Sequence, residues 1–395
     1  MINTLSILND SKKTEFIINA IRNIGGPGVL PLHEPEFNGN EKKYIFECIE
    51  STFVSSVGKY VEEFESNISN FTKSKYVIAV NNGTSALHMS LLTANIKEND
   101  EVLIPSLTFV ATANSVTYCG AIPHFIDCNE NSLSIDPIIL KERLKEIVIK
   151  ENGFSINKKT RRVIKAIIPV HLFGHPAEME EIIKIAADYN LTIIEDAAES
   201  LGSYYQGKHT GTFGLLGAIS FNGNKIITTG GGGAILTANK DLAAKLKHIT
   251  TTAKLKHPWN SVHDQIGYNY RMPNINAALG CAQLERIDFF LSKKRKLYDL
   301  YKKKFHDQNW FKLLNEQDKS KSNYWLQTII LNKPDRKLLN NILSHSNSEG
   351  VVTRPVWKLI SELEPYKNCP KSELDNSKSL ENRIINIPSG VNLVK

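Results

Sequence analysis

The sequence between residues 76 and 238 alternates short apolar, β-branched runs with segments of helical periodicity. The apolar runs fall at 76–80, 101–105, 122–127, 163–170 and 191–197, and helical patterns follow the first four at 85–96, 108–120, 136–150 and 176–190. Near-continuous apolar strands joined by crossover helices form a mostly parallel sheet that is covered on both faces. The sequence therefore predicts an α/β fold, in which a ligand would bind at the carboxyl ends of the strands.

Three segments with different patterns predict the domain organisation. Residues 1–35 have a helical pattern that ends at the turn sequence GGPG, and residues 36–276 contain the alternating region, preceded by a helical pattern in FESNISNF. From residue 277 onwards, long charged helical patterns precede two strand patterns, TIIL and VVTRPVW. We therefore expect an N-terminal helical arm (1–35), a large domain (36–276) and a smaller C-terminal domain (277–395).

Length and composition exclude several classes of protein. Of the 395 residues, 41% are hydrophobic and 23% are charged, which is typical of a globular protein with a sizeable core. No apolar run approaches the length of a membrane span, and the first residues carry acids without the apolar stretch of a secretory signal. We expect a cytoplasmic protein without a membrane partner.

Neither the cysteines nor the charges predict a metal or a nucleic-acid partner. The five cysteines are scattered, without a CxxC pair or a metal-ligand spacing, so reduced and mostly buried thiols are the simpler interpretation. The net charge of +7 comes from dispersed lysines rather than from one basic block. This pattern favours a solvated surface over nucleic-acid binding, and it also suits a phosphorylated small substrate.

Two features of residues 195–233 are candidates for chemistry. Glu195 and Asp196 end the apolar run LTII at the edge of the predicted sheet, where an acid either belongs to a site or caps the next turn. Lys225 is isolated in an uncharged stretch and is followed by IITT and four glycines. Partial desolvation would favour a neutral, nucleophilic amine, whereas the alternative is a surface lysine in a hairpin.

A predicted anion site lies close to these residues. In NNGTSALHMS, Gly83, Thr84 and Ser85 stand between a strand and a helix, so backbone N–H groups and hydroxyls would converge on an anion at the helix N-terminus. Ser220, five residues before Lys225, could add another hydroxyl. A phosphate cup, a carboxylate and an amine at one sheet edge suit a phosphorylated aldehyde cofactor, because they provide its anchor, its ring-nitrogen partner and its Schiff base.

These motifs together resemble a known family. The combination of EDAAESLG and SFNGNKIITTGGGG, with NGTSAL upstream and GYNYRMPNINAALG downstream, is similar to the pyridoxal-phosphate-dependent sugar aminotransferases of the DegT/DnrJ/EryC1/StrS family. The resemblance covers nearly the whole chain. It implies the fold type I architecture of these enzymes, with a mostly parallel seven-stranded sheet in the large domain and a smaller C-terminal α/β domain.

The resemblance also implies roles for individual residues. Lys225 would form the Schiff base, Asp196 would pair with the pyridinium nitrogen, and Phe109 would stack on the cofactor ring, although ordinary core packing is the alternative for Phe109. The phosphate contacts would come from Gly83, Thr84, Ser85 and Ser220. Asn269 in GYNYRM matches a residue that reaches the phosphate of the neighbouring subunit, which implies a homodimer with shared active sites.

Four further positions follow from the same likeness. Many family members carry glutamine where this chain has Glu199, beside the phenolic oxygen of the cofactor, and a carboxylate there needs a proton on one of the two groups. His171 in PVHLFGHP matches a recurrent position near the site, with a satisfied histidine at a strand end as the alternative. Lys59 and Trp357 are candidate substrate contacts. They lie in two of the three loops expected around the sugar carrier, which are 55–60, 204–209 and 354–358.

The expected reaction is a ping-pong transfer between the pyridoxal and pyridoxamine forms of the cofactor, with glutamate as the donor and Lys225 moving the proton. The motif FNGNKIITTGGGG and the segment LHEPEFNGNE resemble enzymes of the legionaminic acid and bacillosamine pathways, which aminate C4 of a UDP-linked 4-keto-6-deoxy-N-acetylhexosamine. GDP- or dTDP-linked substrates of the perosamine type remain alternatives, as does a non-enzymatic regulator. Dehydratase relatives have histidine at the Schiff-base position, so Lys225 argues against that activity.

Overall fold

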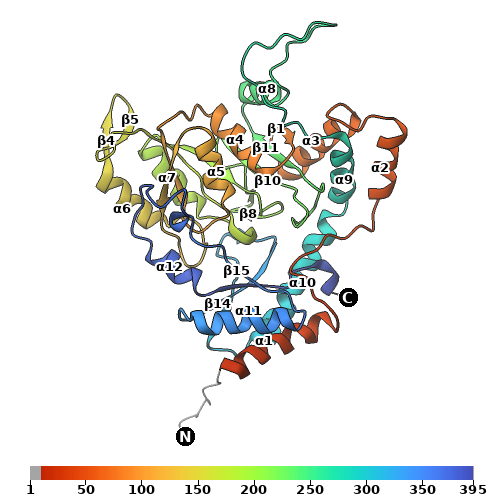
Figure 1. The fold of residues 1–395 in the computed structure, drawn as a ribbon, viewed down its shortest axis with the longest axis vertical. Coiled ribbons are helices and arrows are strands. Elements are labelled where there is room, and N and C mark those ends of the chain that lie inside the picture. The colour runs from red at the N-terminus through yellow and green to blue at the C-terminus, as the bar shows by residue number, and fades with distance from the viewer. Residues whose placement is uncertain (1–9, 395) are drawn as a thin grey trace.

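The computed structural model describes residues 10–394, and its centre is a seven-stranded mixed sheet (Figure 1). The order of its strands is β1 (Tyr76–Val80), β11 (Gly233–Thr237), β10 (Leu216–Ser220), β7 (Thr192–Asp196), β6 (Ile164–Ile167), β2 (Glu101–Pro105) and β3 (Ile122–Ile126). Strand β11 is antiparallel to both of its neighbours, and the other adjacent pairs are parallel. The predicted α/β fold with a mostly parallel seven-stranded sheet is confirmed.

Helices cover both faces of this sheet because its strands are apolar on both sides. One face packs against α4 (Gly83–Thr93), α5 (Ala111–Tyr118) and α8 (Lys240–Ile249). The other face packs against α3 (Lys59–Thr72), α6 (Pro137–Ile147), α7 (Met179–Asp188) and α9 (Asn274–Leu284). Helix α2 (Glu41–Glu50) lies outside α9. The parallel strands therefore present their carboxyl ends along one edge, where the segments β1–α4 and β7–β8 begin.

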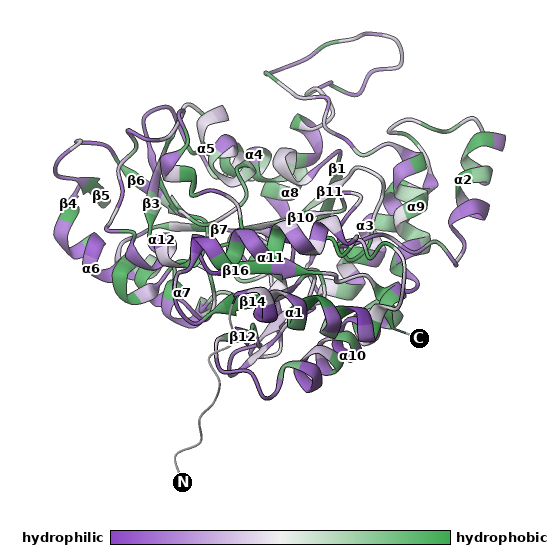
Figure 2. Ribbon diagram, turned by 60° about the horizontal axis from the view of Figure 1, so that its bottom comes forward, coloured by the Kyte–Doolittle hydropathy of each residue, from purple (hydrophilic) through white to green (hydrophobic). Residues whose placement is uncertain are grey.

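A second, antiparallel sheet forms the core of the C-terminal part. Its order is β12 (Phe311–Leu313), β14 (Gln327–Leu331), β16 (Ile384–Ile387) and β15 (Arg354–Pro355). Helices α1 (Asp10–Gly25), α10 (Ile287–Phe305) and α11 (Arg336–Ser348) share one hydrophobic cluster with these strands. Figure 2 shows hydrophobic residues in the strands and alternating hydrophilic and hydrophobic stretches along these helices. The N-terminal helix thus packs beside the C-terminal segment.

Short elements complete the described chain. Two small sheets contain β13 (Ser320–Lys321), β8 (Tyr204–Tyr205) and β9 (Lys208–His209), and the hairpin β4 (Val148–Glu151) and β5 (Phe154–Asn157). Helix α12 (Asp375–Glu381) and the 3₁₀ turns η1 (Leu172–Gly174), η2 (Ile360–Glu362) and η3 (Val391–Leu393) lie in the connections. The segment between α8 and α9 projects from the top of the view in Figure 1.

Several predicted boundaries differ from the structure. The helix predicted at 136–150 is shorter in the structure. Helix α6 ends at Ile147, because Val148 adopts an extended conformation that begins the β4–β5 hairpin. The strand pattern VVTRPVW contributes only Arg354–Pro355 to the sheet. Helix α1 ends at the GGPG turn as expected, and residues 1–9 of the predicted arm lie outside the described residues. The domain boundaries at 35 and 276 remain predictions.

Candidate active site

A cavity of about 310 Å³ lies at the carboxyl ends of β7 and β10, next to the N-terminus of α4. It is lined by Asp196 and Ser220 from the strand ends, by Gly83 and Thr84 from α4, and by Lys225. Trp325 and Trp357 from the C-terminal part close it on another side. The cavity is therefore where an α/β sheet places a ligand site, and it brings together residues that are far apart in the sequence.

Asp196 is the last residue of β7, and its carboxylate is buried at the cavity. One oxygen accepts a hydrogen bond from the Thr112 hydroxyl at 2.7 Å, and the other accepts one from the backbone N–H of Ala198 at 3.2 Å. Burial raises the pKa of the Asp196 carboxyl, and the hydrogen bond from Thr112 is the largest opposing effect. A buried carboxylate held from one side in this way is suited to pair with a cationic group in the cavity.

Glu195 has a different role from its neighbour because successive strand residues point to opposite sides. Its carboxylate accepts hydrogen bonds from the backbone N–H groups of Gly211, Phe213 and Gly214 at 2.6–2.7 Å. His171 Nε2 lies 3.0 Å from the same carboxylate. Glu195 therefore organises the loop before β10, and Asp196 is the member of the acidic pair that reaches the cavity.

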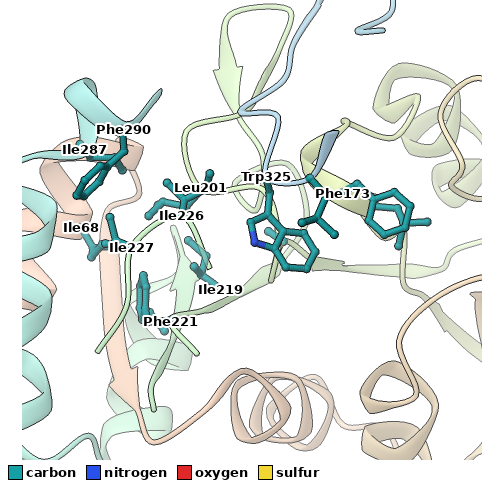
Figure 3. Close-up of a cluster of buried hydrophobic side chains, with 14 of the residues drawn as sticks. Ile68, Phe173, Leu201, Ile219, Phe221, Ile226, Ile227, Ile287, Phe290 and Trp325 are labelled. Atoms are coloured by element: carbon teal, nitrogen blue, oxygen red, sulfur yellow. The ribbon is translucent and has the colours of Figure 1, made fainter. Parts of the chain in front are cut away.

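Lys225 is not a surface lysine, because its side chain is only 14% exposed and its amine is held by two contacts. The Nζ atom lies 3.2 Å from Oε1 of Glu199 and 3.9 Å from the centre of the Trp325 ring. The next residues, Ile226 and Ile227, are buried in a hydrophobic cluster with Phe221, which fixes the chain on the far side of the lysine (Figure 3). The local fold thus directs the amine into the cavity.

Glu199 is almost fully buried beside Lys225 and lines the same cavity. Its second oxygen accepts a hydrogen bond from the backbone N–H of Phe173 at 2.8 Å. Burial raises the pKa of the Glu199 carboxyl, and the nearby Lys225 ammonium opposes that shift. The carboxyl can therefore hold or release a proton next to the amine.

The predicted anion cup has the expected backbone arrangement. Helix α4 begins at Gly83, and the side chain of Asn82 caps it by accepting the N–H of Ser85 at 2.7 Å. Gly83, Thr84 and Ser220 line the cavity, whereas the side chain of Ser85 is buried outside its lining. A Cβ on Gly83 would lie 2.9 Å from the Cβ of Ser220, so glycine allows the helix end to approach the strand end. The free N–H groups of this helix terminus favour an anion.

Two aromatic residues form the outer wall of the cavity. Phe109 is 49% exposed, and its ring lies 5.6 Å, centre to centre, from the ring of Trp357. Trp357 in turn lies 5.6 Å from Phe173. Because Phe109 lines the cavity and is not packed in the core, its ring can stack on a planar ligand.

Besides Ser85, three of the predicted site residues lie outside the cavity lining. His171 is fully buried, and both of its ring nitrogens are engaged, one with Glu195 and the other with the N–H of Ala177 at 3.0 Å. Lys59 forms an ion pair with Glu47 at 2.9 Å in a separate hollow between α2 and α3. Asn269 is exposed on the segment that leads to α9. The roles predicted for these residues remain predictions.

Several residues of the site were not predicted from the sequence. Thr112 lies one helical turn after Phe109, so their shared face could have been recognised from the spacing. Asn222 and Asn224, which flank the turn before Lys225, also line the cavity. Trp325 lies far along the chain from Lys225 and has no local signal, because only tertiary packing brings the two together.

Comparison with known proteins gives a consistent family assignment. A model of the DegT/DnrJ/EryC1/StrS aminotransferase family matches residues 35–395. The GDP-perosamine synthase of Escherichia coli O157:H7 is 38% identical over 369 residues, which cover 91% of this chain and 93% of that protein. The UDP-4-amino-4,6-dideoxy-N-acetyl-beta-L-altrosamine transaminase of Campylobacter jejuni is 36% identical over 275 residues, covering 69% of each chain.

The fold has a solved counterpart of similar length. PseC of Helicobacter pylori, an aminotransferase involved in the biosynthesis of pseudoaminic acid, superposes with a TM-score of 0.83. The two chains share 26% sequence identity, and the match covers 92% of this chain and 95% of the other. The likeness therefore includes both the central sheet and the C-terminal part of the molecule.

Proposed function

Because the chain belongs to the DegT/DnrJ/EryC1/StrS aminotransferase family, we propose that the cavity around Lys225 and Asp196 is its active site and that it aminates C4 of a nucleotide-linked 4-keto-6-deoxy sugar. The chain is a pyridoxal-phosphate-dependent sugar aminotransferase. The observation that supports the proposed site is the presence of an amine, a buried carboxylate and a helix N-terminus in one cavity.

The residues of this cavity fit the cofactor in charge and shape. The N-terminus of α4 with Ser220 suits a phosphate, the exposed Phe109 ring suits a flat aromatic ring, and Asp196 suits a cationic ring nitrogen. The raised pKa of the buried Asp196 carboxyl supports this pairing, because a cation would stabilise the charged form that burial disfavours. When bound, pyridoxal phosphate supplies an aldehyde for the amino group and a ring that accepts electrons from the reacting carbon.

The remaining steps belong to side chains of this chain. Lys225 Nζ would bind the aldehyde carbon and, once displaced by an incoming amine, would move a proton at the reacting carbon. Asp196 would keep the ring nitrogen protonated. Glu199 would hold or accept the proton of the neighbouring amine, since Oε1, the oxygen that does not bond Phe173, lies 3.2 Å from Nζ. The two tryptophans and Phe109 would exclude water from one side of the cavity.

The sugar carrier has two candidates. We propose a UDP-linked 4-keto-6-deoxy-N-acetylhexosamine, supported by the motif FNGNKIITTGGGG and by the likeness to the Campylobacter jejuni enzyme. A GDP-linked 4-keto-6-deoxy sugar is the second candidate, because the GDP-perosamine synthase of Escherichia coli O157:H7 is similar over a larger share of the chain. The proposed amino donor is glutamate, and the product would serve the synthesis of a surface glycan.

The proposed working form is a cytoplasmic homodimer with shared active sites. Support for the dimer comes from the family position of Asn269, which is exposed on the segment between α8 and α9 and so is accessible to a second copy. No helix within residues 10–394 combines the length and the apolar character needed to cross a membrane.

The test is amino transfer from glutamate to a panel of UDP-, GDP- and dTDP-linked 4-keto-6-deoxy sugars, followed by product mass. Turnover of the UDP-linked N-acetyl sugar supports the first candidate, and turnover of only the GDP-linked sugar replaces it with the second. Lys225→Ala should lose the absorbance of the covalently bound cofactor together with turnover, whereas Lys240→Ala, on the exposed start of α8, should keep both. Activity retained by Lys225→Ala would refute the proposed site.

A further inference from the structure

Trp325 contacts the Lys225 amine although it belongs to the C-terminal part of the chain. Trp325 is only 3% exposed, yet it lines the cavity. The Lys225 Nζ atom lies 3.9 Å from the ring centre, well within the distance at which an ammonium is attracted to an indole face. Figure 3 shows the indole beside Phe173 and apart from the aliphatic side chains around Ile226. The indole therefore forms one side of the amine's surroundings.

The same indole also holds the backbone that carries the lysine. Its Nε1–H donates a hydrogen bond of 2.6 Å to the carbonyl oxygen of Asn224, the residue directly before Lys225. Trp325 therefore contacts the lysine amine through its ring face and the backbone of the preceding residue through its ring nitrogen. A side chain that served only to fill the core would need neither contact.

Buried hydrogen bonds fix Trp325 in turn. Its backbone N–H donates to the side chain of Asn323 at 2.8 Å, and its carbonyl accepts from the buried Lys294 amine at 2.7 Å. The amide of Asn323 donates to the carbonyl oxygens of Glu199 and Leu201, each at 2.9 Å. The segment 323–325 thus holds both Trp325 and the backbone of Glu199, the two residues that contact the Lys225 amine.

We propose that Trp325 is a positioning residue for the reacting amine, acting with Glu199 so that Lys225 Nζ has one open direction, toward the cavity. The proposal rests on the proposed function, in which Lys225 is the amine that binds the cofactor. Glu199 contacts Nζ on one side at 3.2 Å and the indole covers another, so two contacts of different kinds define its place. Since small displacements of a reacting group slow proton transfer strongly, such restraint affects the chemical step.

The experiment compares Trp325→Phe, Trp325→Leu and a matched control. Phenylalanine keeps a ring face and loses the hydrogen bond to Asn224, whereas leucine loses both. The control is Trp310→Phe, because Trp310 also donates its Nε1–H, to Gln308 at 2.8 Å, and also has a lysine over its ring, Lys13 at 5.6 Å, but lies outside the cavity. Two readouts are needed: the induced circular dichroism of the bound cofactor per unit of absorbance, and single-turnover transfer from glutamate.

Loss of restraint should reduce the induced circular dichroism severalfold in Trp325→Leu and less in Trp325→Phe, with Trp310→Phe unchanged. The single-turnover rate constant should fall about tenfold in Trp325→Leu, while the dissociation constant of glutamate stays within about twofold. If Trp325→Leu keeps the induced circular dichroism and the single-turnover rate constant of the wild type, the proposal is overturned. If Trp325→Leu does not fold, wild-type values of both quantities in Trp325→Phe overturn it. If Lys225→Ala still binds the cofactor covalently, the proposed function fails instead.

Discussion

Lys225 and Glu199 form a largely buried ion pair, with Nζ and Oε1 3.2 Å apart and side-chain exposures of 14% and 7%. The pair combines the amine proposed to bind the cofactor with a carboxyl group whose pKa is raised by burial. Such pairs are costly to break from one side, because the remaining charge loses its partner. Glu199 can therefore change its charge directly beside the amine.

Glu199→Gln should remove one inflection from the pH profile of covalent cofactor binding. A glutamine can still accept the N–H of Phe173, but it does not titrate, so the step contributed by the Glu199 carboxyl, whose pKa is raised by burial, disappears. The measurement is the rate at which the cofactor absorbance develops in cofactor-free protein across a pH series. Glu181→Gln, which makes the same charge change on the exposed face of α7, should leave the profile in place. An identical profile in both variants would disprove the coupling.

Thr112→Val tests the support of Asp196. The substitution keeps the volume of the buried side chain and removes the hydrogen bond of 2.7 Å to the carboxylate. Because hydrogen bonds to charged groups are the stronger ones, we expect kcat/KM for glutamate to fall roughly tenfold. Thr117→Val is the matched control on the same helix, since its hydroxyl donates to the carbonyl oxygen of Ala113 and lies outside the cavity lining. Equal activities in the two variants would show that Asp196 does not depend on this bond.

Gly83→Ala tests the close approach of α4 to β10. An added Cβ would lie 2.9 Å from the Cβ of Ser220, which is closer than side chains normally pack, so one of the two elements must move. We expect the dissociation constant of pyridoxal phosphate to rise about tenfold, the size of a modest overpacking cost. At Gly223, in the loop before Lys225, a Cβ would have its nearest neighbour at 4.0 Å, so Gly223→Ala should bind the cofactor normally. If Gly83→Ala binds pyridoxal phosphate with the affinity of the wild type, the phosphate does not bind at the N-terminus of α4 as proposed.

The sequence predicts the strands best where a buried sheet requires continuous apolar residues. The runs at 76–80 and 101–105 coincide with β1 and β2 because both strands are covered on each face. The β4–β5 hairpin was missed because its residues are partly exposed and alternate without a long apolar run. Short, half-exposed strands depend on their partners, and single-sequence patterns carry little information about partners.

The site shows the same limit. Asp196, Gly83 and Lys225 stand at strand ends or in glycine-rich turns, where the local sequence already predicts a ligand edge. Trp325 carries no such signal, since an indole in an apolar stretch is usually core. Only the packing of the C-terminal segment against the turn before Lys225 shows that this residue belongs to the site.

The last prediction concerns pH and stability, and it uses a buried histidine away from the cavity. His175 is 2% exposed, and neither of its ring nitrogens has a hydrogen-bond partner within residues 10–394. Burial lowers its pKa to about 4. A pKa below the unfolded value means that the unfolded chain binds the extra proton first, so stability is full above about pH 6.5 and falls as the pH decreases toward about 4.

His175→Leu should therefore be less sensitive to acid than the wild type. Without the titrating ring, the loss of unfolding free energy between pH 7 and pH 5 should shrink by on the order of 2 kcal/mol, measured by denaturant unfolding at both pH values. His209 is also buried with a pKa of about 4, so part of the acid sensitivity remains. His175→Asn should reduce the difference in unfolding free energy between pH 7 and pH 5 by the same amount, whatever the stability of that variant at pH 7, because asparagine does not titrate either. The control His306→Asn, at an exposed position, should leave that difference unchanged. A difference as large as in the wild type for both His175 variants would show that folding does not lower the pKa of this ring.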